Sequence, residues 1–197
     1  MYNKKIIIVI PCFKVKNKIL NVISQIPKWI DYIICVDDAC PEKSGNFIKE
    51  NNNDDRVLIL FNDENLGVGG ASMVGFKHAR KLGAEIIVKI DGDDQMDLKL
   101  INNFIEPIIS NDADFTKGNR FTKLKDYLDM PISRKIGNIS LSFFNRFSSG
   151  YWKLFDTTNG YLCFNAKLID LMPLDKVSKD YFFESDLLNW LYILRAK

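Results

Sequence analysis

The chain alternates short apolar runs with segments in which apolar residues recur every three or four positions. Runs rich in β-branched residues predict buried strands at residues 6–10, 32–36, 57–61 and 86–90. The segments between them predict helices at residues 19–26, 45–50 and 71–82, and a further helix at 98–108 leads to a strand at 113–117. This order predicts an α/β fold with a mostly parallel sheet and helices on both of its faces.

The pattern changes after residue 120, where residues 121–131 are polar and irregular. Apolar positions then predict a helix at 134–149, a last strand at 161–164 and a terminal helix at 181–196 that is rich in aromatic and aliphatic residues. Neither a repeat nor a low-complexity linker divides the sequence. We therefore expect one domain over residues 1–197.

Composition narrows the classes of function. The 197 residues carry a net charge of +2 without a long run of one sign, so broad nucleic-acid binding is not expected. The four cysteines have no CxxC spacing and the single His78 cannot complete a usual zinc set or a Ser-His-Asp triad. We expect buried thiols in a reducing cytosol, with extracellular pairing as the alternative. A stretch of about 18 apolar residues, as a membrane span requires, is absent from the sequence.

The candidate chemistry lies directly after the predicted strands, where parallel sheets bind their ligands. Residues 91–97 follow the fourth strand and hold four carboxylates, which repel each other unless a cation or solvent separates them. Asp91 and Asp93 can turn toward one hard cation across a tight turn at Gly92, and Gln95 can add an amide oxygen. The alternative is a solvated acidic turn, and Asp97 is expected to be only a helix cap.

Two further segments have both a functional and a structural interpretation. Asp37 and Asp38 end the second strand and can bind a base or ribose, or else cap the next helix. Glycines within residues 65–71 open a helix, where backbone N–H groups can approach an anion, or where small residues allow close helix packing. Basic residues that could hold a diphosphate or an anionic acceptor are Lys117, Arg120, Arg134 and Lys135.

Taken together, these motifs resemble those of family 2 glycosyltransferases, and most of all the polyprenyl-phosphate branch that includes dolichol-phosphate mannose synthase-like enzymes. The resemblance covers roughly residues 5–165. It rests on segments that follow the family's order, at residues 10–13, 36–38, 65–71, 91–95 and 117–121.

The resemblance implies a GT-A fold, which has a Rossmann-like sheet. Residues 1–120 would bind a nucleotide-sugar donor and residues 121–197 would form the acceptor side. Mg²⁺ or Mn²⁺ at the diphosphate would be held by Asp91 and Asp93, with help from Gln95. Asp38 would contact the nucleoside, with Asp37 beside it. The other nucleotide-sugar-binding residues that the resemblance implies are Pro11, Phe13, Asn65, Gly67, Gly69, Lys117, Arg120 and Arg134.

On the acceptor side, the resemblance implies catalytic roles for Asp156, Glu184 and Asp186. Residues 155–161 match a segment at the family's acceptor site, and residues 183–186 resemble an acidic pair that other branches use as a base. The sequence leaves open whether Asp156 or Asp186 is the base. The implied reaction is an inverting transfer to a polyprenyl-phosphate or glycan acceptor, as in cell-envelope polysaccharide biosynthesis, in which metal and basic groups stabilise the leaving nucleoside diphosphate.

The chain departs from the family pattern in places. Residues 37–40 read Asp-Asp-Ala-Cys instead of Asp-Asp-Gly-Ser, and Lys14 replaces a common asparagine, changes that would alter base selectivity. A Gln-x-x-Arg-Trp segment is absent, which argues against a processive synthase. Many relatives continue into C-terminal membrane helices, so the chain is either naturally short or part of a longer one.

The implied location is the cytoplasm, at the inner face of the cell membrane. The aromatic-rich faces of residues 134–149 and of the terminal helix suit a peripheral membrane contact, and core or homo-oligomer packing is the alternative. Two other functions stay open. One is a sugar-nucleotide-forming nucleotidyltransferase, although residues 11–15 lack its Gly-rich basic loop. The other is a non-catalytic, transferase-like binding domain.

Overall fold

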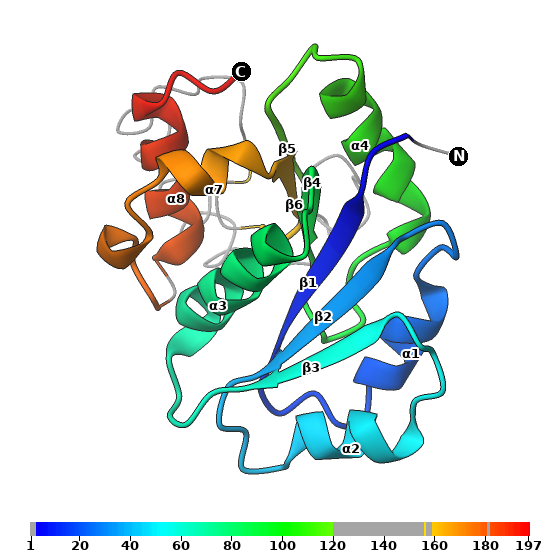
Figure 1. The fold of residues 1–197 in the computed structure, drawn as a ribbon. Coiled ribbons are helices and arrows are strands. Elements are labelled where there is room, and N and C mark those ends of the chain that lie inside the picture. The colour runs from blue at the N-terminus through cyan, green and yellow to red at the C-terminus, as the bar shows by residue number, and fades with distance from the viewer. Residues whose placement is uncertain (1–2, 120–155, 157–158, 181) are drawn as a thin grey trace, which may run out of the picture.

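Strands from both halves of the chain share one sheet in the order β3-β2-β1-β4-β6-β5 (Figure 1). The computed structural model describes residues 3–119, 156, 159–180 and 182–197. Within them the strands are β1 Ile6–Cys12, β2 Tyr32–Asp37, β3 Val57–Phe61, β4 Ile86–Lys89, β5 Phe115–Lys117 and β6 Leu162–Asn165. Strands β1 to β4 are mutually parallel, and β6 runs antiparallel between β4 and β5. The predicted mostly parallel sheet is therefore confirmed.

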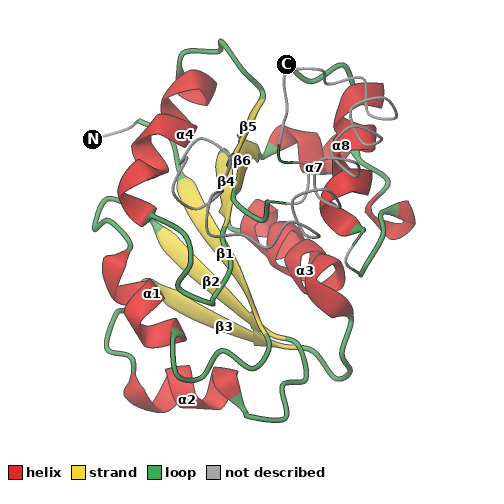
Figure 2. Ribbon diagram, turned by 180° about the vertical axis from the view of Figure 1, so that it is seen from behind, coloured by secondary structure: helices red, strands yellow, loops and turns green. Residues whose placement is uncertain are grey.

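Helices cover both faces of the sheet, as the sequence predicts (Figures 1 and 2). One face carries α3 Gly67–Lys81, α7 Lys167–Leu171 and α8 Phe183–Ile193. The other carries α1 Ile19–Gln25, α2 Ser44–Asn51 and α4 Ile101–Ile109. The 3-10 helix η1 Leu98–Leu100 precedes α4, and η3 Leu174–Lys176 follows α7. Helix α7 was not predicted. The helix expected at 134–149 and the irregular stretch at 121–131 lie outside the described residues.

The alternation of side chains along the strands explains why their sequences are apolar throughout. Ile7 and Val9 of β1 enter the core beneath α3 and α8, whereas Ile6, Ile8 and Ile10 enter the core beneath α1 and α4. Both faces of β1 are thus buried, which requires an apolar residue at every position. All four cysteines are free and buried, as expected.

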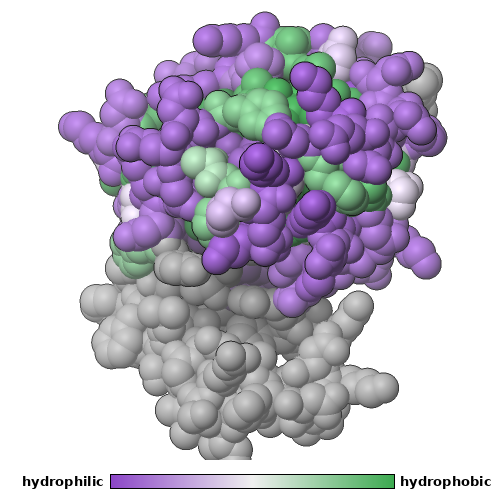
Figure 3. Space-filling model, turned by 90° about the horizontal axis from the view of Figure 1, so that it is seen from below, coloured by the Kyte–Doolittle hydropathy of each residue, from purple (hydrophilic) through white to green (hydrophobic). Residues whose placement is uncertain are grey.

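The terminal helix divides its apolar residues between core and surface. Leu187, Leu188 and Leu191 of α8 are buried against the sheet, whereas Tyr192 and Ile193 are exposed. Among the described residues, none of the helices is both long and apolar enough to cross a membrane. Among the described residues on the face drawn in Figure 3, hydrophilic ones predominate and apolar ones form small, separate groups.

Candidate active site

Three segments distant in sequence meet at one edge of the sheet because of strand direction. Strands β4 and β5 end there with Lys89 and Lys117, and both residues register with Leu162 at the start of the antiparallel β6. The acidic segment after β4, the residues after β5 and the residues before β6 therefore converge. The carboxyl ends of β1 and β2 lie at the same edge, where Cys12 registers with Asp37. This is the place at which a sheet of this kind binds ligands.

The two aspartates after β2 are buried and hold neighbouring loops in place. The Asp37 carboxylate accepts hydrogen bonds from the backbone N–H groups of Cys40 at 2.8 Å and Gly45 at 2.5 Å. Asp38 Oδ1 accepts from the Asn62 side chain at 2.7 Å and from the Leu66 backbone N–H at 2.9 Å. Asp37 thus binds the first turn of α2, in keeping with the capping alternative, although Lys43 is the N-cap residue. Asp38 instead shapes the loop that leads to α3.

The glycine-rich segment at the start of α3 packs closely against the segment before α8. The N–H groups of Gly69 and Gly70 both donate to the Lys179 carbonyl, at 2.9 and 3.3 Å. A Cβ on Gly69 would lie 2.6 Å from the Ser178 carbonyl oxygen and 2.8 Å from Phe183. Because these N–H groups are engaged within the chain, the structure supports the close-packing alternative over the anion-binding one. Gly67, at φ 75°, donates to the Asn65 side chain at 3.0 Å.

Asp91 is held by a buried lysine, Lys89, which is not among the residues predicted from the sequence. Lys89 is 1% exposed, and its Nζ donates to Asp91 Oδ1 at 2.6 Å and to Glu184 Oε1 at 3.2 Å. Burial disfavours the ammonium, but the two carboxylates outweigh this effect and raise the pKa of Lys89. A lysine inside an otherwise apolar strand was the available signal, since a lysine so placed requires buried acidic partners.

The backbone at Gly160 lies so close to Asp91 that it leaves no room for a side chain at this position. A Cβ built on Gly160 would lie 2.6 Å from Lys89 Nζ and closer still to Asp91 Oδ2, whereas real Cβ contacts essentially never fall below 3.0 Å. Gly160 therefore packs directly over the Lys89–Asp91 ion pair. The other carboxylates of the acidic segment make contacts of their own. Asp93 Oδ1 accepts from the Gln95 backbone N–H at 3.2 Å, and Asp94 binds the side chains of Asn21 and Gln25.

Lys117 and Asp156 extend this cluster of charges. Lys117 Nζ donates to the Asn159 carbonyl, and the Asn159 side chain donates to Asp156 Oδ2 at 3.3 Å. Burial lowers the pKa of Lys117 to about 8. The Glu184 carboxylate opposes this shift, and the Lys89 ammonium adds to it. Asp156 is 3% exposed. This cluster at the sheet edge thus joins two lysines, Lys89 and Lys117, with three carboxylates, Asp91, Asp156 and Glu184, from four segments of the chain.

Comparison with known proteins identifies the family of this chain. The sequence profile described as "Glycosyl transferase family 2" matches residues 7–172. The chain belongs to glycosyl transferase family 2. It is 31% identical over 195 residues to the UDP-N-acetylglucosamine--dolichyl-phosphate N-acetylglucosaminyltransferase of Methanococcus voltae, covering 92% of this chain and 77% of that protein. It is also 28% identical to the undecaprenyl-phosphate mannosyltransferase of Micrococcus luteus, over 79% of this chain and 63% of that protein.

Solved structures of this fold bear out the architecture. The glucosyl-3-phosphoglycerate synthase of Mycobacterium tuberculosis superposes with a TM-score of 0.71 at 17% identity, covering 98% of this chain and 67% of that one. A crystal structure of that enzyme with Mg²⁺ and UDP superposes with a TM-score of 0.70 at 15% identity, covering 98% of this chain and 66% of that one. The predicted GT-A fold is confirmed, and membership of the family makes this chain a glycosyltransferase rather than a nucleotidyltransferase.

The acidic pair at the start of α8 is divided between two different contacts in this glycosyltransferase. Glu184 faces Lys89, whereas Asp186 Oδ2 accepts from the Ser178 backbone N–H at 2.8 Å. The sheet-edge cluster therefore contains Glu184 and Asp156. The described contacts of Asp186 lie outside this cluster. Asp97 caps η1 by accepting from the Lys99 backbone N–H at 3.1 Å, as expected.

The remaining predicted binding residues of the glycosyltransferase lie in varied settings. Pro11 is half-buried, and Phe13 is exposed with the Lys14 ammonium 5.4 Å from its ring centroid. Ala39 has φ 49°, a left-handed conformation that favours the glycine of the family pattern. Lys14 connects the loops that follow β1 and β2, because its backbone N–H donates to Cys40 Sγ at 3.1 Å. Arg120, Arg134 and Lys135 lie outside the described residues.

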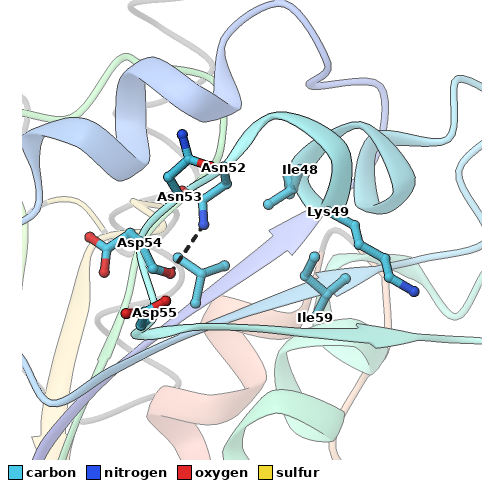
Figure 4. Close-up of a pocket in the computed structure, with 8 residues that line it drawn as sticks. Ile48, Lys49, Asn52, Asn53, Asp54, Asp55 and Ile59 are labelled. Atoms are coloured by element: carbon cyan, nitrogen blue, oxygen red, sulfur yellow. Dashed lines mark hydrogen bonds between the residues drawn. The ribbon is translucent and has the colours of Figure 1, made fainter.

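A separate cavity of about 450 Å³ opens at the opposite edge of the sheet (Figure 4). It is lined by the end of α2, the loop of residues 52–55 and the first part of β3. Arg56 neutralises Asp54 there through an ion pair at 2.6 Å, and its guanidinium lowers the pKa of Asp54 far below the usual range. The cavity therefore lies at the amino end of β3, away from the carboxylates after β2 and β4.

Proposed function

We propose that this glycosyltransferase transfers a sugar, with inversion, from a nucleoside-diphosphate donor to a polyprenyl-phosphate acceptor. The observation that carries the proposal is the convergence of Asp91, Lys117 and Asp156 at one edge of a GT-A sheet. The chemistry of the acceptor is supported by the two relatives named above, whose names specify dolichyl-phosphate and undecaprenyl-phosphate. UDP is the first nucleotide to test, because it appears in the name of the 31% identical relative.

Asp91 and Asp93 after β4 offer carboxylate oxygens, the kind of ligand that suits Mg²⁺ or Mn²⁺. Among the described residues, His, Cys, Asp and Glu side chains do not gather in groups of three or more that could hold a metal. Asp91 and Asp93 would therefore supply two carboxylates, and the donor diphosphate and water would complete the coordination. This division is the usual one for Mg²⁺, which keeps waters and binds through one or two carboxylates plus substrate phosphates. The metal, when bound, would stabilise negative charge on the leaving diphosphate.

The residues of the chain would divide the remaining work by position. Asp38 would shape the nucleoside side of the site, because it holds the Asn62–Leu66 loop beside the end of β2. Lys117 would bind phosphate, and Asp156 would orient the acceptor. A phosphate acceptor is already an anionic nucleophile, so strong base catalysis is not required. For this role we favour Asp156 over Asp186, because Asp156 is linked to Lys117 through Asn159 and its charge acts on the Lys117 ammonium.

The direct test of the proposal is transfer of labelled sugar to a short-chain polyprenyl phosphate in detergent, with UDP-N-acetylglucosamine, UDP-glucose and GDP-mannose as donors. We expect a metal-dependent lipid-linked product from one donor, with the opposite anomeric configuration to the donor. Formation of product with EDTA present, or retention of configuration, would refute the proposed mechanism. Donor binding without any transfer would instead support the non-catalytic alternative.

A second prediction concerns the pH dependence of donor binding through Lys117. Burial lowers the pKa of its ammonium to about 8, so the side chain is charged below pH 8 and neutral above it. An anionic ligand favours the charged form, and its affinity is therefore full at pH 7 and falls above pH 8, by up to roughly tenfold per pH unit. Calorimetric titration of UDP with Mg²⁺ between pH 7 and 9.5 measures this fall.

The matched control for that titration is Lys117→Arg, which keeps its charge throughout this range. We expect the affinity of the arginine variant to stay level where that of the natural protein declines. Parallel pH curves for the two proteins would show that Lys117 does not bind the diphosphate.

A further inference from the structure

Of the charged residues that the structure describes at the sheet edge, Lys89 is the least exposed, and its ammonium has two carboxylate partners. Its Nζ lies 2.6 Å from Asp91 and 3.2 Å from Glu184, with side-chain exposures of 1%, 33% and 11% for the lysine, Asp91 and Glu184. An ammonium buried without partners would lose its proton or destabilise the fold. The two carboxylates together hold the Lys89 ammonium in place. Removing either one therefore alters the position of the group that holds the other.

The helix that carries Glu184 is anchored independently of Lys89. Asp186 holds the Ser178 backbone N–H at 2.8 Å, and the Lys179 carbonyl accepts from the first turn of α3. Phe183 is fully buried and packs against the position of Gly69, where a Cβ would collide with it. Glu184 is therefore presented to Lys89 by a helix start that is fixed on both sides, which makes the Lys89–Glu184 contact a rigid support.

Asp91 is in turn held through one oxygen, while 33% of its side chain stays exposed. Oδ1 accepts from Lys89, and Oδ2 lies over Gly160, where the chain leaves no space for a Cβ. A carboxylate that binds a metal through one oxygen is commonly oriented by a hydrogen bond at the other. Lys89 occupies that second position at Asp91. Glu184 has no described contact with Asp91 and reaches it only through Lys89.

We propose that Lys89 and Glu184 are positioning residues for Asp91, and that Glu184 is not the catalytic base. Lys89 orients the Asp91 carboxylate toward the divalent cation, and Glu184 fixes Lys89. This inference rests on the proposed function, because it assigns the roles of residues around the proposed metal ligand. It also assigns separate structural tasks to the acidic pair, since Asp186 anchors the segment before α8 and Glu184 supports β4.

The experiment compares metal affinity with turnover in Glu184→Gln. Free Mn²⁺ is measured by electron paramagnetic resonance in a titration of the UDP-bound protein, and kcat is measured as a function of Mn²⁺ concentration. A positioning role predicts that the Mn²⁺ dissociation constant rises roughly 10- to 100-fold, while kcat at saturating Mn²⁺ stays within a few-fold of the natural protein. A base role predicts an unchanged Mn²⁺ affinity and a kcat lower by roughly 10²- to 10⁴-fold, which would overturn the inference.

Asp170→Asn is the matched control, because Asp170 is exposed and pairs with Arg80 on the surface of α7 and α3. This acid-to-amide change should leave both the Mn²⁺ dissociation constant and kcat unaltered. A Mn²⁺ affinity in Glu184→Gln equal to that of the control would sink the positioning role.

A second pair of variants separates positioning from folding. Lys89→Met leaves Asp91 and Glu184 without their shared cation, and we expect Tm to fall by roughly 6–20 °C. Adding Glu184→Leu removes the buried charge, so the double variant should recover most of this Tm. It should not recover Mn²⁺ affinity, because Asp91 still lacks its orienting partner. Recovery of natural Mn²⁺ affinity in the double variant would contradict the inference.

The result for the natural protein distinguishes failure of the inference from failure of the proposed function. If the natural protein binds no Mn²⁺ in the presence of UDP, GDP, CDP or dTDP, then the metal site and the inference fall together. If it binds Mn²⁺ and the Lys89 and Glu184 variants bind equally well, only the positioning roles are refuted.

Discussion

Gly160→Ala should remove most of the metal-dependent nucleotide binding while the chain still folds. The new methyl group would lie 2.6 Å from Lys89 Nζ and closer still to Asp91 Oδ2, so the ion pair beneath it must move. Overpacking of a buried site costs about 1–3 kcal/mol of unfolding free energy. Displacement of the proposed metal ligand Asp91 should also weaken Mn²⁺ binding, by roughly tenfold or more. Mn²⁺ titration of the UDP complex and urea unfolding measure the two effects.

Gly83→Ala is the matched control for this prediction. Gly83 has φ 82° and open space around its missing Cβ, so alanine there costs about 1 kcal/mol or more through backbone conformation alone. Gly160 is not among the described glycines with positive φ, and its substitution acts through steric overlap. We expect both variants to lose stability and only Gly160→Ala to lose Mn²⁺ affinity. Equal Mn²⁺ affinities would show that the close approach at Gly160 is unimportant to the site.

The order of elements in the first half of the chain could be predicted because each strand is buried on both faces. A short, continuous apolar run such as that of β1 is typical of a strand in a parallel sheet, and the helices between the strands have clear periodicity. The placement of β6 could not be predicted. Its pairing with β4 joins Val88 to Cys163, which are far apart in sequence. A short apolar run does not indicate which strand it pairs with or in which direction it runs.

The location of the candidate site could be predicted from strand direction, but the contacts within it could not. The sequence predicted Asp37, Asp38 and Asp91 at the carboxyl ends of their strands, where the structure has them. It could not show that Asp37 binds the first turn of α2 or that Lys89 holds Asp91. Lys89 and Glu184 are 95 residues apart, so only the packing of α8 against the sheet brings them together. The same packing explains the glycine-rich segment, whose N–H groups bind the Lys179 carbonyl rather than an anion.

We propose that a cation held by Asp91 and Asp93 couples the nucleotide to the protein. Substitution of the neighbouring residues Asp93 and Asp94 provides a test and its control. Asp93 is half-buried at the proposed site, whereas Asp94 is exposed and binds Asn21 and Gln25 away from it. Asp93→Asn should lose metal-dependent nucleotide binding because an amide is a much weaker ligand for Mn²⁺ than a carboxylate. Asp94→Asn should retain it, and asparagine also tolerates the φ of 59° at this position.

The measurement is thermal unfolding with UDP, GDP, CDP or dTDP, each in the presence of Mn²⁺ or EDTA. At about 100 times its Kd, one nucleotide should raise Tm by roughly 5–10 °C with Mn²⁺ and by little with EDTA. We expect this metal-dependent increase in the natural protein and in Asp94→Asn, and its loss in Asp93→Asn. An increase that is the same with EDTA, or that survives in Asp93→Asn, would contradict the assignment of the metal site.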